Sequence, residues 1–438
     1  MLRDFAGNID VIYQVCGTSE FFKFLNKKNL NNLIIWLFLF FNNLIFDYII
    51  VGGGIVGLAT AKAIYELESD ASILLVEKES SIASHQTGHN SGVIHSGIYY
   101  PAASLKSKLC KEGLALTKNF CSEHKIPFEN CGKLIVATNL LEENRLVELY
   151  NKSKLNHPNI SLINSDLLKS MEPSVNGNLA IYSPDTGIVD YRKIAIKIAE
   201  LVQKKGLIIQ LSTTVNRINE RSNLVEIGND HVNWQAKKII VCGGLQADRL
   251  ARIAGLKIDF RIVPFKGEYF ILPSSKNSII NHLIYPVPDP TLPFLGIHLT
   301  RMIDGGITVG PNATISFSRE KYSKLAFNLK DISSYLAFPG FWKLTLKHRA
   351  HVLHEIKTSF FKNLYLRDCQ KYYPDLKMQD LLPYKPGIRA QLVHSSGLME
   401  NDFLFRKTNR MLHVLNAPSP AATSAFPIGR IIAEHVIN

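Results

Sequence analysis

Three glycines near the start of the chain have the spacing that a nucleotide phosphate site requires. Gly52, Gly54 and Gly57 follow the pattern G-x-G-x-x-G directly after an apolar stretch. In this pattern the first glycine permits a tight turn, the second lets backbone approach a pyrophosphate, and the third lets a helix pack closely on a strand. Glu77, about 20 residues further on, is placed to accept hydrogen bonds from ribose hydroxyls. Together these residues predict a site for NAD or FAD rather than for NADP.

The elements that must position these glycines can be recognised around them. Residues 47–51 form an apolar run typical of a strand, and residues 58–67 continue at helical spacing with good helix formers. Residues 71–79 contain a second apolar strand. The order of strand, glycine turn, helix and strand predicts a Rossmann-type unit that holds phosphate at the helix N-terminus.

Later segments distinguish FAD from NAD. Residues 237–244 predict another strand, which ends in glycines, and short strand-like runs before it make Val215 a candidate for backbone contact near the adenine. Residues 411–436 predict a strand, a turn of small residues and a closing helix. The positive end of such a helix suits an electron-rich flavin ring, so this segment favours FAD.

Longer motifs make the sequence similar to one known family. They are His85–Lys106, Pro264–Phe270, His282–Ala313, Gly387–Gln391 and Asn416–Gly429. They resemble segments of L-2-hydroxyglutarate oxidases and dehydrogenases, within the D-amino-acid-oxidase-like flavoproteins. The similarity extends from Asp47 to the C-terminus, although residues 324–351 fit it less clearly, and their role stays open.

The resemblance implies an α/β fold with a Rossmann-like FAD-binding domain and a second, α+β substrate domain that carries a mixed sheet. The FAD-binding domain is expected from discontinuous segments, about 47–120, 185–255 and 385–438, and the substrate domain from about 121–184 and 256–384. FAD is the expected cofactor. The residues expected to contact it are Gly52, Gly54, Gly57, Glu77, His89, Asn90, Ser91, Gly92, Val215, Gly243, Ser419, Ala421, Ala422 and Thr423.

Histidine is the residue type best suited to the reaction that the resemblance implies. Oxidation of a 2-hydroxy acid removes the hydroxyl proton while the C2 hydrogen leaves as hydride, and the base must lie within about 3 Å of the hydroxyl. Three histidines are candidates: His89 and His95 beside the expected flavin segment, and His298 in the expected substrate domain. We favour His298, because a residue on the covering domain can face the flavin across the substrate, and we place His95 second.

L-2-hydroxyglutarate carries two carboxylates, which guanidinium groups bind well through paired hydrogen bonds. Arg301 and Arg389 are the expected ligands, because both lie in family-like motifs. Lys266 and Tyr285 are expected to add a charge and a hydroxyl donor. For each residue, an ion pair or hydrogen bond at a domain interface is the alternative role.

Composition limits the other possibilities. The net charge of +13 comes from scattered lysines rather than a clustered stripe, which argues against nucleic acid and leaves peripheral contact with a membrane open. The six cysteines form no C-x-x-C pair, so no metal site is expected, and a cytoplasmic location fits their spacing. The apolar run 33–41 is shorter than the roughly 20 residues that span a bilayer, and we expect residues 1–46 to be a disordered extension or a translation artefact.

Three questions stay open at this stage. The electron acceptor can be a quinone, oxygen or a soluble carrier. The substrate of another flavoenzyme of this fold, glycerol 3-phosphate or an amino acid, is the main alternative. An RNA-modifying flavoprotein and a nicotinamide dehydrogenase are weaker ones, since the basic residues are not clustered and the segment 416–429 would then have no purpose.

Overall fold

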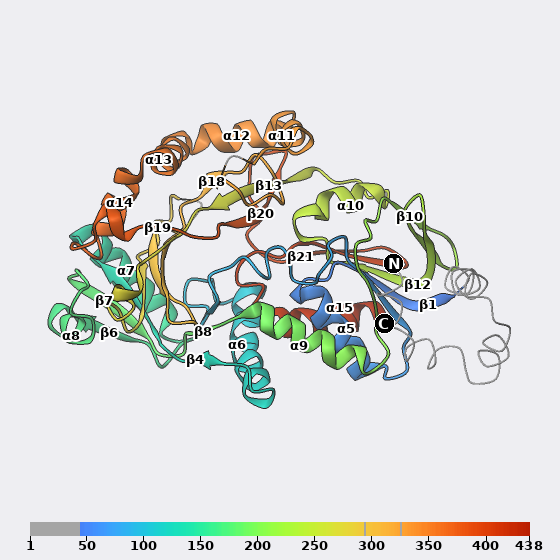
Figure 1. Cartoon of the computed structure of the whole chain (residues 1–438), viewed down its shortest axis with the longest axis horizontal. Coiled ribbons are helices and arrows are strands. Elements are labelled where there is room, and N and C mark those ends of the chain that lie inside the picture. The colour runs from blue at the N-terminus through green and yellow to red at the C-terminus, as the bar shows by residue number, and fades with distance from the viewer. Residues whose placement is uncertain (1–43, 293–294, 325) are drawn as a thin grey trace.

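The computed structural model describes residues 44–292, 295–324 and 326–438. Two eight-stranded sheets organise the described chain, one at each end of the elongated molecule shown in Figure 1. The α/β class and the second, mixed sheet that were predicted from the sequence are both confirmed.

The first sheet has the strand order β10-β11-β12-β1-β2-β9, with β22 beside β12 and β21 beside β22. Its centre is parallel, because β1 pairs in parallel with both β2 and β12. The buried residues of β1, Ile49 and Ile50 among them, are fully enclosed, as expected for a strand covered on both faces. The strands are β1 (Ile45–Val51), β2 (Ile73–Val76), β9 (Ile208–Gln210), β10 (Arg217–Glu220), β11 (Val225–Gly228), β12 (Asn233–Val241), β21 (Leu404–Lys407) and β22 (Met411–Asn416).

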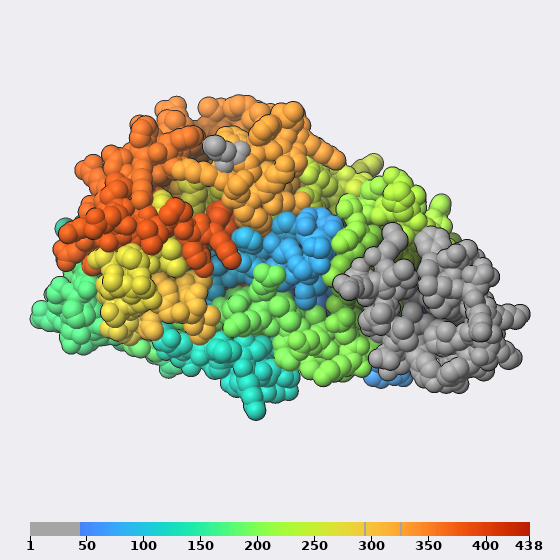
Figure 2. Space-filling view, in the orientation of Figure 1, coloured from blue at the N-terminus to red at the C-terminus, as the bar shows by residue number. Residues whose placement is uncertain are grey.

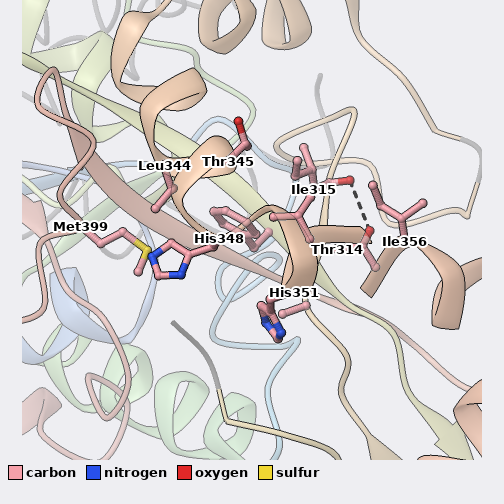
Figure 3. Close-up of a pocket in the computed structure, with 11 residues that line it drawn as sticks. Thr314, Ile315, Leu344, Thr345, His348, His351, Ile356 and Met399 are labelled. Atoms are coloured by element: carbon pink, nitrogen blue, oxygen red, sulfur yellow. Dashed lines mark hydrogen bonds between the residues drawn. The ribbon is translucent and has the colours of Figure 1, made fainter. Parts of the chain in front are cut away.

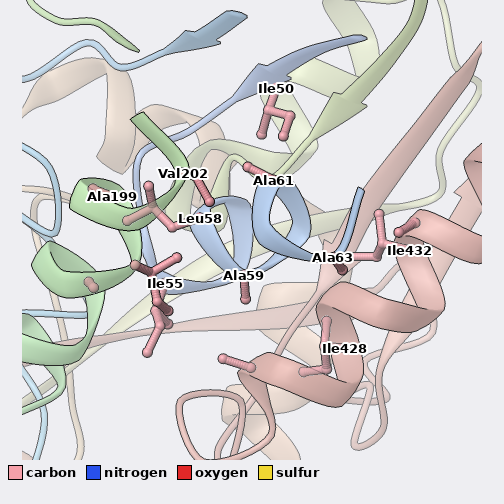
Figure 4. Packing of buried hydrophobic residues seen from close by; sticks show 14 of the residues in the cluster. Ile50, Ile55, Leu58, Ala59, Ala61, Ala63, Ala199, Val202, Ile428 and Ile432 are labelled. Atoms are coloured by element: carbon pink, nitrogen blue, oxygen red, sulfur yellow. The ribbon is translucent and has the colours of Figure 1, made fainter. Parts of the chain in front are cut away.

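The helix after the glycine turn lies at the centre of one hydrophobic core. Helix α5 packs between α9 and α15, with Leu58 of α5 near Val202 of α9 (Figure 4). Small residues make this close packing possible, since a Cβ on Gly429 would lie 2.6 Å from the backbone of Ala59. The helices on this side are α5 (Ile55–Leu67), α6 (Leu105–Glu123), α9 (Tyr191–Gln203), α10 (Ala247–Ile253) and α15 (Ala425–Ile437), with the 3-10 turn η1 (Gly244–Gln246).

The second sheet has the order β19-β14-β17-β16-β15-β5-β7-β6. It is mixed, because β15 pairs in parallel with β5 and antiparallel with β16. Its elements are β5 (Lys133–Ala137), β6 (Ser161–Asn164), β7 (Leu179–Ser183), β14 (Phe270–Ile271), β15 (Leu283–Pro286), β16 (His298–Arg301), β17 (Ile307–Gly310) and β19 (Leu382–Pro383), with α7 (Leu140–Ser153), α8 (Ser165–Met171), α14 (Lys362–Gln370), η2 (Ser274–Lys276) and η3 (Met378–Asp380).

Two three-stranded sheets join these parts. In one, β13 pairs along its whole length with β20; in the other, β8 pairs with β3 and β4. The region 324–351, whose role the sequence left open, contains α11, α12 and the start of α13, and these three helices lie outside β13 (Figure 1). These elements are β3 (Val93–Ile94), β4 (Phe128–Glu129), β8 (Gly187–Val189), β13 (Phe260–Gly267), β18 (Thr314–Ile315), β20 (Gly387–His394), α11 (Leu329–Leu336), α12 (Pro339–Lys347) and α13 (Arg349–Phe360).

The expected domain boundaries stay a prediction. The strands of the first sheet lie within the segments assigned to the FAD-binding domain, apart from the start of β1, and those of the second within the substrate segments. Strand β20 belongs by sequence to the FAD-binding segment 385–438 but pairs with β13 of the other segment.

The expected boundary of the N-terminal extension needs correction. Residues 1–43 lie outside the described part of the chain. Ile45 and Phe46, which we assigned to the extension, are the first residues of β1 and pair with Gln235 and Ala236. Phe46 is only 1% exposed. Within the described residues, β1 therefore begins at Ile45, two residues before the boundary at Asp47 that we expected.

A buried histidine in the first sheet gives a testable pH dependence. Neither ring nitrogen of His413, on β22, has a hydrogen-bond partner among the described residues, and burial lowers its pKa to about 4. Below about pH 6.5 His413 is protonated in the unfolded chain but stays neutral in the folded chain. The free energy of unfolding therefore falls as the pH is lowered from about 6.5 toward 4. Between about pH 7.5 and about pH 5, the free energy of unfolding should fall by about 2 kcal/mol less in His413→Leu than in the wild type. Urea unfolding at the two pH values measures this difference. Equal losses in both proteins would contradict this.

Candidate active site

A cavity of about 1040 Å³ runs between the two large sheets. One part of its wall comes from the turns that follow β1, β2 and β12, and another from β15, β16 and β20. In an open parallel sheet, ligands bind at the carboxyl ends of the strands, which is where this cavity meets β1 and β2. The volume is large enough for a dinucleotide with a small substrate beside it.

The three glycines of the motif have different structural roles at this part of the cavity wall. Gly52 has a φ of +110°, and a Cβ there would lie 2.4 Å from the carbonyl oxygen of Cys242. A Cβ on Gly57 would lie 2.2 Å from the carbonyl oxygen of Gly52. A Cβ on Gly54 would meet only the Thr87 hydroxyl at 3.4 Å, so its free side faces the cavity. Gly54 is the N-cap of α5 and supplies no side-chain cap itself, while the Thr87 hydroxyl accepts from the backbone N–H of Ile55 (3.0 Å), so this helix N-terminus faces the cavity with its other N–H groups available to a phosphate.

Glu77 lies at the end of β2, on the cavity wall. Its carboxylate accepts hydrogen bonds from the backbone N–H of Gly53 (2.7 Å) and of Glu79 (2.9 Å). These bonds fix the carboxylate beside the glycine turn while leaving lone pairs for other donors. Val215 and Gly243, the other residues expected near the adenosine, also line the cavity.

Gly54→Val tests the phosphate site without disturbing the protein. The φ of −78° and ψ of 173° at Gly54 suit valine, and its Cβ would meet no protein atom closer than the Thr87 hydroxyl at 3.4 Å. We expect a folded protein whose affinity for FAD falls at least about a hundred-fold, because the side chain takes the space of the pyrophosphate. FAD titration followed by flavin fluorescence measures this, with melting compared against flavin-free wild type. Gly57→Ala is the contrast: its Cβ strikes backbone, so it should destabilise the fold itself.

The C-terminal turn and the 85–95 segment meet at the other part of the cavity. Ser419, Ala421, Ala422 and Thr423 all line it. The Thr423 hydroxyl accepts a hydrogen bond from the backbone N–H of His95 (3.1 Å) and bonds the Tyr191 hydroxyl (2.8 Å). The start of α15 is thereby fixed beside the segment that was expected to contact the flavin.

Three of the four residues 89–92 line the cavity, and one does not. His89 stacks on Tyr322 with ring centroids 3.7 Å apart and bonds the carbonyl oxygen of Pro386. Asn90 and Ser91 are also on the wall. Gly92 is not on the wall: a Cβ there would lie 2.7 Å from the carbonyl oxygen of Val189, so this glycine permits the close approach of β3 and β8, and its contact with the cofactor stays a prediction.

His298 lies on β16, buried and facing the cavity. Its Nδ1 is 3.0 Å from the carbonyl oxygen of Gly296, which can only accept, so Nδ1 carries the proton and Nε2 carries the lone pair. The ring stacks on Tyr285 with centroids 4.1 Å apart. Burial lowers the pKa of His298 to about 3, helped by the positive charges of Arg389 and Lys133. The imidazole is therefore neutral and able to accept a proton.

His95 lies on the same cavity. Its pKa is lowered to about 3, mainly by burial and then by the positive charge of Lys133. The structure thus brings both histidines that we favoured to one place. The carbonyl oxygen of His95 also accepts a hydrogen bond from the Cys110 thiol (3.2 Å), which fixes the backbone at this position.

Two of the four expected substrate ligands reach the cavity. Arg389, on β20, and Tyr285, on β15, are on its wall. Arg301 is not: it forms an ion pair with Glu129 (3.1 Å) and donates to the carbonyl oxygen of Asn281 (2.7 Å). Alternation along β16 explains the error, because His298 faces the cavity and a residue three positions later points to the opposite side of the sheet.

Lys266 also lies away from the cavity wall. It is buried, and its Nζ donates to the carbonyl oxygen of Ser323 (2.9 Å). The next residue, Gly267, does line the cavity. The family-like motif therefore places the strand correctly, whereas the motif alone could not tell which of its side chains would point inward.

Several residues at the cavity were not singled out from the sequence. Tyr99, Tyr100 and Lys106 line it and belong to the His85–Lys106 motif, so the motif itself was the available signal. For Lys133 the sequence offered only a weaker indication, namely a single charged residue at the start of the otherwise apolar strand β5. It is 1% exposed, and its Nζ lies 4.5 Å from the ring centre of Tyr99 and 5.2 Å from that of Tyr285. Burial lowers the pKa of Lys133 to about 8.

Comparison with known proteins defines the class. Residues 47–435 match the family described as FAD dependent oxidoreductase (DAO). The structure is similar to FAD-bound L-alpha-glycerophosphate oxidase from Mycoplasma pneumoniae, with a TM-score of 0.73 and 24% identity, covering 90% of this chain and 95% of the other. Glycine oxidase from Geobacillus kaustophilus has a TM-score of 0.69 at 17% identity, covering 90% and 94%. These two likenesses concern the fold.

Sequence relatives are more specific. The chain is 46% identical to L-2-hydroxyglutarate dehydrogenase of Escherichia coli K12, covering 89% of this chain and 93% of that protein. It is 40% identical to the human mitochondrial L-2-hydroxyglutarate dehydrogenase, covering 89% and 88%. The chain belongs to the FAD dependent oxidoreductase family and, within it, to the L-2-hydroxyglutarate dehydrogenases. Its cofactor is FAD, which the open glycine cradle and the cavity fit.

Proposed function

We propose that this enzyme oxidises L-2-hydroxyglutarate to 2-oxoglutarate, with FAD as the hydride acceptor. The observation that carries the proposal is the neutral His298 beside Arg389 on the wall of the cavity that the glycine cradle opens into. The identity of 46% to L-2-hydroxyglutarate dehydrogenase of E. coli supports the same substrate.

His298 is the base in this proposal. Its Nε2 takes the proton of the substrate hydroxyl while the hydrogen on C2 leaves as hydride, so that the C2–O bond becomes a carbonyl. Bound FAD supplies the hydride acceptor. The two negative charges of the substrate raise the pKa of His298 from its value of about 3, because a nearby anion favours the imidazolium. His298 thus becomes a better base only when substrate is present.

The positive charges around the cavity suit a dianion. Arg389 and Lys106 lie on the wall, and the buried Lys133 lies behind the rings of Tyr99 and Tyr285. Arg389 binds one substrate carboxylate in this proposal, since guanidinium and carboxylate form paired hydrogen bonds. The aromatic rings exclude water from the reacting atoms.

Anaerobic reduction tests the proposal. L-2-hydroxyglutarate is expected to bleach the flavin absorbance of the purified protein, and D-2-hydroxyglutarate is not. Glycerol 3-phosphate and glycine complete the panel, because proteins of similar fold are named for acting on them. Bleaching by glycerol 3-phosphate alone would contradict the proposed substrate and leave the cofactor intact.

The electrons leave to a quinone, to oxygen or to another carrier. Quinone reduction requires contact with a membrane, and we include peripheral contact with the inner face of the cytoplasmic membrane in the proposal. No helix of residues 44–438 that the structure describes is long and apolar enough to cross a bilayer. Reoxidation rates of the reduced enzyme with a short-chain quinone and with oxygen distinguish the acceptors.

A further inference from the structure

The helices of residues 329–360 cover one edge of the molecule, outside the β13 sheet (orange in Figures 1 and 2). Their inner side packs firmly. Phe341 and Leu344 of α12 join Tyr335 of α11 in a core against β13. A crevice of about 20 Å³ beneath α12 and α13, lined by His348 and His351 among others (Figure 3), has room for about one water molecule. This crevice is too small for an organic ligand.

The outer side of these helices is unusually apolar. Leu329 is 73% exposed, Leu346 66% and Phe360 70%. Trp342 lies four residues before Leu346 on α12, and Leu353 lies seven before Phe360 on α13, so each pair projects from one face of its helix. Every Phe or Trp that is exposed among the described residues lies between Phe317 and Phe361. We name Phe327, Leu329, Trp342, Leu346, Leu353, Phe360 and Phe361 the apolar ridge.

Positive charge accompanies the apolar ridge. Lys343, Lys347 and Lys357 are exposed on the same helices. The two acidic side chains of helices α11 to α13, Asp331 and Glu355, pair with groups elsewhere in the fold. Asp331 forms an ion pair with Arg249 (2.8 Å), and Glu355 accepts from the backbone N–H of Ala313 (2.6 Å). The outer face is therefore both apolar and basic.

We propose that the apolar ridge docks this enzyme on an anionic lipid bilayer. Short helices with Leu, Phe and Trp on one side and lysines beside them lie in the plane of a membrane interface, with the apolar side chains inserted and the ammonium groups among the headgroups. A second copy of this chain fits the ridge poorly, because a two-fold contact sets one basic face against another. The inference names the surface for the membrane contact proposed above and does not depend on the substrate.

Flotation with vesicles tests the ridge, using the full chain with FAD bound. We expect the protein to float with vesicles of phosphatidylcholine containing about a third phosphatidylglycerol, and to be released by high salt. Combined replacement of Leu346, Leu353 and Phe360 by serine should weaken binding at least about ten-fold. Replacement of Leu140, Leu141 and Leu155, which are exposed on α7 and just after it, is the matched control and should leave binding unchanged.

Turnover with a soluble dye acceptor should be unchanged in both variants, because these described side chains do not line the cavity. The two assays test the two proposals separately. A protein that floats but does not oxidise L-2-hydroxyglutarate would support the apolar ridge and contradict the proposed substrate. The proposal is overturned if the wild type does not float, or if the ridge variant floats as well as the wild type. It is also overturned if light scattering without lipid shows a dimer that the ridge variant loses.

Discussion

His298→Gln is expected to slow reduction of the flavin by saturating L-2-hydroxyglutarate about a thousand-fold, the usual contribution of a positioned base. The ring of His298 is held by Gly296 and Tyr285 with its lone pair on Nε2, and glutamine has no comparable base. Stopped-flow absorbance under anaerobic conditions measures the rate constant. FAD content should stay at the wild-type level, because the glycine cradle lies on other strands.

His95→Gln is the companion variant, because His95 lies on the same cavity and has the same lowered pKa, about 3. We expect it to slow the reduction much less. A normal rate in the His298 variant together with a lost rate in the His95 variant would assign the base to His95. Normal rates in both would remove histidine from the chemical step.

Arg389→Met is expected to lower kcat/KM for L-2-hydroxyglutarate about a hundred-fold or more, mainly through KM. Methionine keeps most of the length of the side chain and removes the charge, so the carboxylate loses its partner in a buried site. Steady-state assays with a dye acceptor measure the effect. A 2-hydroxy acid with one carboxylate locates the contact: an equal loss for both acids places Arg389 at the carboxylate they share, and a larger loss for the diacid places it at the distal one.

Arg301→Met is the matched control for that variant. Arg301 is also an arginine on a strand, β16 of the second large sheet, but it pairs with Glu129 away from the cavity. Because a partly exposed ion pair contributes little, KM should change by no more than about two-fold. A large rise in KM for the Arg301 variant with none for the Arg389 variant would contradict the assignment made from the structure.

The sequence by itself determined the dinucleotide end of the molecule. Gly52, Gly54, Gly57 and Glu77 lie within one local unit of strand, turn and helix, so their spacing along the chain is also their spacing in space. The α/β class and the second mixed sheet followed from long family-like motifs and are confirmed. The exposed ridge on α11 to α13 was invisible in the sequence, because a core helix and a surface helix share the same apolar periodicity.

Only the tertiary structure decided which of the expected charged residues line the cavity. Arg301 and Arg389 both stand in motifs of equal weight, yet one residue of register on a strand decides whether a side chain faces the cavity or the other side of the sheet. Lys133 lies behind the ring of Tyr285 because β5 pairs in parallel with β15, which brings residues about 150 positions apart into contact. Local spacing carries no information about such long-range pairing, which is why the residues expected at the cofactor, apart from Gly92, line the cavity, whereas two of the four expected at the substrate do not.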